Sequence, residues 1–228
     1  MAEGSILWRR LDTPGHDACR LEETGTGWQL DGAAVFGHDG VPARLNYHVA
    51  CDLTWRTQRG QVRGWLGAES VEFSIERTAA GVWTLNGAVV SGLGSCVDLD
   101  FGFTPATNLP QLRRLALAEG RAAEAPVAWL DVSAGTLEAL PQRYERRTEG
   151  TYWYEAPRFE YAALLEVTSI ASSVAIRVSG RGSRDRGSGA AVPDASWCRL
   201  VRDGAVRRAS HAGGRGYRPG CWSLPPTW

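Results

Sequence analysis

The chain has 228 residues, 43% of them hydrophobic, and its 25 basic and 25 acidic residues balance to a net charge of zero. Five scattered cysteines without a Cys-x-x-Cys spacing argue against a disulfide framework or a zinc site. No stretch approaches the roughly 20 apolar residues that a membrane helix requires. We therefore expect a soluble, cytoplasmic protein without a membrane span, a metal site or a cofactor.

The first half of the chain alternates between apolar and polar residues with a period of two. The longest example spans residues 45–55, and residues 70–76 repeat the pattern. Glycine-containing turn signals separate such runs at short intervals, at Asp31-Gly32, Asp39-Gly40, Ala80-Gly81 and Asn86-Gly87. This arrangement predicts antiparallel hairpins.

The segment 96–114 joins an alternating strand to a stiff polar turn. Asp98 and Asp100 fall on one side of the strand, about 6 to 7 Å apart at Cα, while the apolar residues fall on the other side. Thr107 and Asn108 follow in a turn that is bracketed by two prolines, which restrict the backbone. The turn leads to Arg113, so this segment presents a fixed group of polar side chains.

The rest of the chain continues mainly as strands. Short helices are predicted over residues 109–119 and 133–140, and further strands over 152–154, 159–168 and 169–178. So many strands without crossover helices predict an all-β fold, an antiparallel many-stranded roll or barrel-like sheet that is closed or nearly closed.

The composition changes after residue 179. Residues 1–179 carry 16 arginines and 22 acidic residues, whereas residues 180–228 carry nine arginines and three aspartates. The glycine- and arginine-rich segment 180–228 has too little apolar surface to fold. We expect one β domain over 1–179, followed by a tail that is disordered or unrelated in sequence, with weak nucleic-acid binding as its alternative role.

The motifs Asp98-x-Asp100, Thr104-Pro-x-Thr-Asn108, Leu109-Pro110 and Arg113-Arg-Leu115 resemble those of a bacterial family, the putative glycolipid-binding proteins. Trp55-Arg-Thr57, Gln142-x-Tyr144 and Tyr152-x-Tyr154 fit the same pattern. The resemblance spans about residues 6–178. It implies an all-β spiral roll or barrel similar to lipid carriers.

The predicted site combines a polar rim with aromatic side chains. The two aspartates serve either as ligand contacts or as partners of the turn, and we expect one of the adjacent arginines to hold a carboxylate such as Asp100. Tyrosines and tryptophans suit a binding mouth as well as a core. The candidate ligand contacts are Asp98, Asp100, Thr107, Asn108, Arg113, Arg114, Trp55, Gln142, Tyr144, Tyr152 and Tyr154.

Non-catalytic binding of an amphipathic ligand, such as a glycolipid or a related lipid, is the function that this pattern favours. The four histidines lie beside no nucleophile or metal-ligand motif, and no phosphate-binding loop is present. Two alternatives stay open. One is a hydrolase or other enzyme that acts on a carbohydrate or lipid through Asp98 and Asp100. The other is an interaction protein whose barrel is filled by its own side chains.

Overall fold

The computed structural model describes residues 3–170, 173–179 and 197–199. Its largest sheet is entirely antiparallel and has the strand order β17-β1-β2-β3-β4-β5-β6-β7-β8. The strands are β1 Glu3–Arg10, β2 Gly15–Thr24, β3 Gly27–His38, β4 Val41–Asp52, β5 Thr57–Leu66, β6 Glu69–Arg77, β7 Trp83–Leu85, β8 Ala88–Val90 and β17 Trp197–Arg199. From β1 to β8 each strand pairs with its neighbours along the chain.

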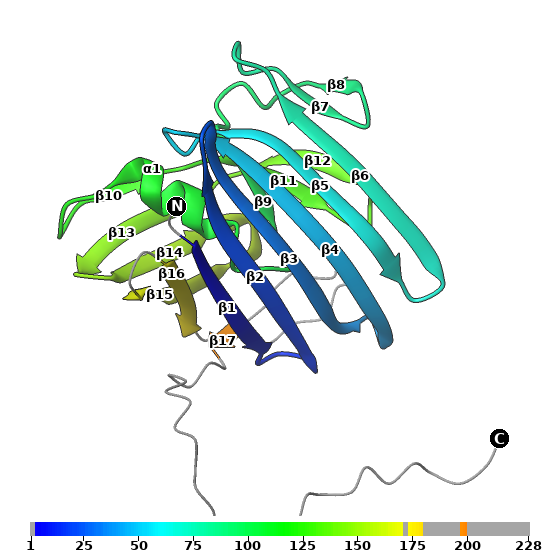
Figure 1. Cartoon of the computed structure of the whole chain (residues 1–228), viewed down its shortest axis with the longest axis horizontal. Coiled ribbons are helices and arrows are strands. Elements are labelled where there is room, and N and C mark those ends of the chain that lie inside the picture. The colour runs from blue at the N-terminus through cyan, green and yellow to red at the C-terminus, as the bar shows by residue number, and fades with distance from the viewer. Residues whose placement is uncertain (1–2, 171–172, 180–196, 200–228) are drawn as a thin grey trace, which may run out of the picture.

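Two smaller sheets and one helix complete the described fold. The second sheet has the order β10-β13-β14-β15-β16 and the third β12-β11-β9. Their elements are β9 Asp98–Phe101, α1 Asn108–Leu115, β10 Ala122–Glu124, β11 Val127–Asp131, β12 Thr136–Leu140, β13 Arg143–Thr148, β14 Thr151–Ala156, the 3-10 turn Pro157–Phe159, β15 Tyr161–Ile170 and β16 Ser173–Ser179. Figure 1 shows these sheets and α1 on one side of the large sheet.

The predicted all-β class is confirmed, but the described sheets do not close into a barrel. The large sheet runs from β17 to β8 without returning to its first strand. One pairing departs from the antiparallel prediction, because β9 lies parallel to β11. None of the described helices is long and apolar enough to cross a membrane.

The alternation in β4 has the predicted effect. Its residues at odd positions from Ala43 to Cys51 are buried, while Arg44 and Asn46 are exposed on the outer face. The Asp39-Gly40 and Asn86-Gly87 turns both place two residues at positive φ, as tight hairpin turns require. Asp31-Gly32, by contrast, lies inside β3 and is not a turn.

The two predicted helices have different outcomes. The first forms as α1 and ends at Leu115, because Ala116 adopts a left-handed conformation with φ of 43°. The second prediction, over 133–140, is wrong, since Thr136–Leu140 is strand β12. Asp131 accepts hydrogen bonds from the backbone N–H groups of Ser133 and Ala134, which closes the β11–β12 hairpin instead.

The predicted domain boundary after residue 179 stays a prediction. Most of the segment 180–228 lies outside the described residues. Its described part is β17, and this strand pairs with β1 in antiparallel register.

Candidate functional site

Strand β9 carries the two aspartates of the central motif, and both of its faces are buried. The carboxylate of Asp98 accepts hydrogen bonds from the guanidinium of Arg114 on α1, at 3.1 Å from Nε and 2.6 Å from the terminal nitrogen. Burial raises the pKa of Asp98, and the hydrogen bond and charge of Arg114 oppose that rise. The prediction that one of the adjacent arginines holds a carboxylate is therefore confirmed, but the carboxylate is Asp98 and not Asp100.

Asp100 instead belongs to a network without a positive charge. Its carboxylate accepts hydrogen bonds from the Thr107 hydroxyl and from the Gln142 amide, both at 2.6 Å. Burial raises the pKa of Asp100, and these two hydrogen bonds oppose the rise. Thr107 also accepts the backbone N–H of Phe101. The threonine is the residue before α1, and its side chain ties β9 to the turn and does not cap the helix.

The network continues from Gln142 to Tyr144 and Asn108. The Tyr144 hydroxyl lies 2.7 Å from Oδ1 of Asn108 and 3.0 Å from Oε1 of Gln142. Thr107, Gln142 and Tyr144 have no exposed surface. The structure thus brings five predicted residues together in the interior, where they join β9, the turn, α1 and β13.

Asn108→Ala tests the contribution of the turn to this network. The change removes one acceptor of a buried hydroxyl, and Gln142 still offers the other, so we expect a loss of about 1 kcal/mol in the free energy of unfolding. Asn46→Ala on the exposed face of β4 is the matched control and should change stability by less than about 0.5 kcal/mol. Chemical denaturation measures both. Equal stability of Asn108→Ala and wild type would contradict the role of Asn108.

The remaining predicted residues lie around this centre. The rings of Tyr144 and Tyr154 contact each other, with centroids 5.1 Å apart, and Tyr152 lies in the same strand as Tyr154. Trp55 is in the β4–β5 turn, stacked on Trp28 at 4.3 Å. The guanidinium of Arg113 lies over the Trp55 ring, 5.8 Å from its centroid.

The burial of the predicted residues limits their access to a ligand. Asp98, Thr107, Gln142 and Tyr144 have no exposed surface, so a ligand would reach them only if the domain opened. Their positions therefore favour a structural role. Ligand contact by the eleven predicted residues stays a prediction.

A second buried polar cluster joins the large sheet to the same motif. The Asp17 carboxylate on β2 accepts hydrogen bonds from the Thr104 hydroxyl at 2.5 Å and from the Tyr47 hydroxyl at 3.0 Å. Asp17 has no exposed surface, and burial raises its pKa to about 7, while Thr104, Tyr47 and the charge of Arg10 oppose the rise. Tyr47 occupies the space where a side chain at Gly32 would lie.

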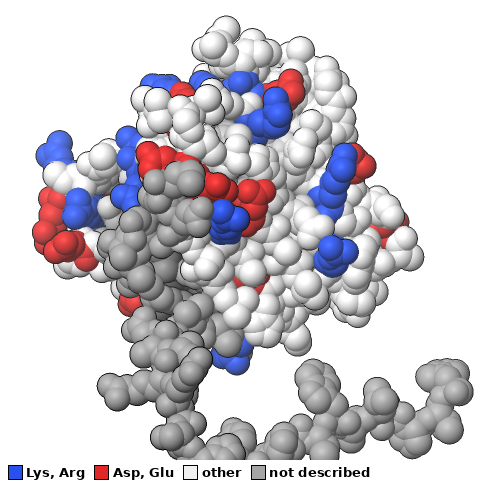
Figure 2. Space-filling model, in the orientation of Figure 1, with Lys and Arg blue, Asp and Glu red and all other residues white. Residues whose placement is uncertain are grey.

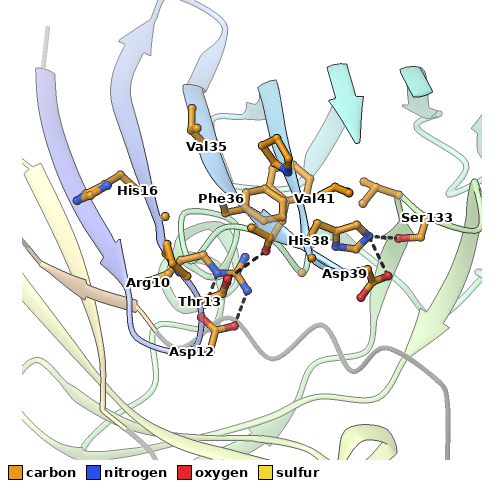
Figure 3. Close-up of a pocket in the computed structure, with 18 of the residues that line it drawn as sticks. Arg10, Asp12, Thr13, His16, Val35, Phe36, His38, Asp39, Val41 and Ser133 are labelled. Carbon is orange, nitrogen blue, oxygen red and sulfur yellow. Dashed lines mark hydrogen bonds and ion pairs between the residues drawn. The ribbon is translucent and has the colours of Figure 1, made fainter. Parts of the chain in front are cut away.

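An open pocket of about 860 Å³ adjoins this cluster (Figure 3). Three turns form its rim, those between β1 and β2, between β3 and β4, and between β11 and β12. Its apolar wall includes the parallel rings of Phe36 and Phe103, whose centroids are 6.3 Å apart. The ring of Tyr47 packs edge-on against Phe103, so the Asp17 cluster lies directly behind this wall.

The polar groups of the pocket are partly paired with each other. Arg10, whose side chain is only 7% exposed, donates two hydrogen bonds to Asp12 and lies over the Phe36 ring. Nε2 of His38 is 3.0 Å from the Ser133 hydroxyl and 3.6 Å from the Asp39 carboxylate. Figure 3 shows the His38 contacts linking the β3–β4 turn to the β11–β12 turn.

None of the eleven predicted residues lines this pocket, and the sequence reading missed those that do. Arg10 follows Ile6 and Trp8 at an inward position of β1, and this position is a sequence signal for the pocket. Asp17, in the cluster behind the pocket wall, precedes Cys19 and Leu21 in the same way on β2. A charged residue at an inward position of an alternating strand indicates a buried polar site.

Comparison with known proteins agrees with this architecture. A search of curated proteins found no match. Among solved structures, a DUF1089 family protein from Pseudomonas aeruginosa has a similar fold, with a TM-score of 0.62 and 24% identity over 70% of this chain and 86% of that one. The model of the family described as "Putative glycolipid-binding" matches residues 5–171. The chain therefore belongs to the putative glycolipid-binding family.

Proposed function

We propose that this protein binds an amphipathic molecule with an uncharged, hydroxyl-rich head group, such as a glycolipid, in the pocket of Figure 3 and does not transform it. The observation that carries the proposal is the ion pair between the buried Arg10 side chain and the partly exposed Asp12, beside an aromatic wall. A volume of about 860 Å³ is within the usual range for small-molecule sites. The family description supports the same class of ligand.

The charges of the pocket favour an uncharged head group over a phosphate. Asp12, Asp39 and Asp131 line the pocket and would repel an anion, while Arg10 is already paired with Asp12. Hydroxyl groups, in contrast, can donate to carboxylates and accept from a guanidinium at the same time. The phenylalanine rings offer an apolar surface to an acyl chain or to a sugar face.

The surroundings of the motif aspartates support binding over catalysis. Both oxygens of Asp100 already accept hydrogen bonds from Thr107 and Gln142, and Asp98 is held by Arg114. An acid or base must reach the proton that it transfers. Carboxylates that are buried and engaged in this way are poorly placed for that task.

Lipid extraction and native mass spectrometry of the gently purified protein, followed by titration with an alkyl glucoside, test the proposal. Arg10→Gln should weaken alkyl glucoside binding about tenfold or more, since a hydrogen bond to a charged group contributes about 1.5 to 3 kcal/mol. Arg113→Gln, which changes the same charge outside the pocket, is the control and should bind like wild type. Tighter binding of an alkyl phosphate of equal chain length, or equal effects of the two variants, would contradict the proposal.

A further inference from the structure

The outer face of the large sheet carries a row of basic and apolar side chains near the pocket end. The strand registers place Arg9, His16, Val35, Arg44 and Trp65 opposite one another on β1 to β5. With strands about 4.8 Å apart, the row extends over about 19 Å. Trp65 is half-buried and the others are exposed, Val35 at 52%.

The arginines of this row differ from those elsewhere on the same face. Arg63 is paired with Glu72 at 2.6 Å, and Arg20 with Glu22 at 3.2 Å. Neither Arg9 nor Arg44 forms an ion pair with an acidic residue in the described part of the chain; Arg44 has only a 3.5 Å contact to the Asn46 amide oxygen. The row therefore presents positive charge that no neighbouring carboxylate cancels directly.

The acidic residues at this end lie outside the row. Asp39 is in the β3–β4 turn beside His38, and Asp12 is in the β1–β2 turn, paired with Arg10. Asp131, which also lines the pocket, is the last residue of β11. Glu69 begins β6, one strand beyond Trp65. Figure 2 shows the lower part of the large sheet as mostly uncharged surface with separate basic groups and a few acidic atoms.

From this row we infer that the outer face of the sheet docks on a lipid bilayer that contains anionic lipids. Arginine next to tryptophan and aliphatic side chains is the combination that suits the interface of a membrane, since the charges meet the head groups and the aromatic ring lies between water and hydrocarbon. Leu11, which is 51% exposed in the β1–β2 turn, adds an apolar contact at the same end.

The placement has a consequence for the pocket. Val35 belongs to the row and also borders the pocket, so docking brings the pocket rim close to the bilayer. The inference does not depend on the pocket's ligand, because Arg10 is absent from the row. Loss of docking and loss of pocket binding can therefore be measured separately.

Co-sedimentation of the full chain with vesicles tests the inference. We expect binding to mixed phosphatidylcholine–phosphatidylglycerol vesicles, weaker binding to phosphatidylcholine alone, and a decrease with added salt. Each arginine near an anionic surface contributes about fivefold, so the double variant Arg9→Gln/Arg44→Gln should bind about 20-fold less tightly. Thermal melting of the variant checks that the sheet is intact, as expected for exposed positions.

Arg59→Gln is the matched control. Arg59 is exposed on the outer face of β5, six residues and about 20 Å from Trp65, and its replacement changes the net charge equally per site. It should retain nearly full vesicle binding. Three results would overturn the inference: no wild-type binding to anionic vesicles, an equal loss per site in Arg59→Gln, or binding to an RNA oligonucleotide in place of vesicles.

Discussion

Replacing Arg114 by alanine should lower the free energy of unfolding by about 3 to 5 kcal/mol, the usual cost of breaking a buried ion pair by removing one partner. Asp98 has no exposed surface and would keep its carboxyl group in the interior without the hydrogen bonds that the Nε and terminal nitrogen of Arg114 donate. Loss of Arg114 also removes an interaction that opposes protonation of Asp98. The deficit should therefore be smaller at pH 5 than at pH 8.

Arg113→Ala is a close control because it removes the same side chain one residue earlier. Arg113 is exposed, and its described contact is with the Trp55 ring, so its loss should cost no more than about 1 kcal/mol. Urea unfolding of both variants at the two pH values makes the comparison. Similar losses in the two variants would show that the Arg114–Asp98 pair has no special part in stability.

Asp17→Asn should remove most of the decrease in stability between about pH 4 and pH 7. The pKa of Asp17 is about 7 in the folded chain and near its ordinary value of 3.8 in the unfolded chain. Between these values the folded state holds a proton that the unfolded state has released, so stability falls as pH rises and levels off above pH 7. The difference corresponds to about 4 kcal/mol.

Asparagine keeps the size of the side chain but cannot ionise. The free energy of unfolding of the variant, taken relative to wild type, should therefore be higher at pH 8 than at pH 5. A smaller slope of the same sign should remain, because burial also raises the pKa of Asp98 and Asp100. Asp39→Asn, at a side chain that is 69% exposed, should keep the wild-type profile. If Asp17→Asn retained the full wild-type slope, the assignment of the slope to Asp17 would be wrong.

The alternation of apolar and polar residues predicted the large sheet well, because the residues of one strand show which of its two faces is buried. The alternation in β4 and the turn at Asp39-Gly40 required no knowledge of distant partners. The parallel pairing of β9 with β11 could not be predicted in this way, since the residues of one strand do not determine which other strand it pairs with. The segment of strand β12 was wrongly predicted as a helix. Hydrogen bonds from backbone N–H groups to the Asp131 side chain form a turn there, and this turn leads into a strand.

In the candidate site, too, local features could be predicted from the sequence and contacts with distant segments could not. The motif correctly predicted a fixed polar group, but the partners of its members depend on distant segments, such as Gln142 for Asp100. Adjacent residues on a helix point about 100° apart, so only one of Arg113 and Arg114 can face β9, and the sequence does not say which. Alternation placed the two aspartates on one side of the strand and the apolar residues on the other, and it did not indicate that both faces of β9 are covered in the fold.

The hydrogen bond between Thr104 and Asp17 spans 87 residues and has a consequence for how the chain matures during synthesis. The hairpins from β1 to β8 join sequence neighbours and can form as soon as they leave the ribosome. Asp17 and the apolar inner face of the large sheet stay uncovered until the segment 98–165, which is synthesised later, packs over them. The nascent sheet thus has an uncovered hydrophobic face for part of translation, and apolar surface that is exposed in this way is prone to aggregation.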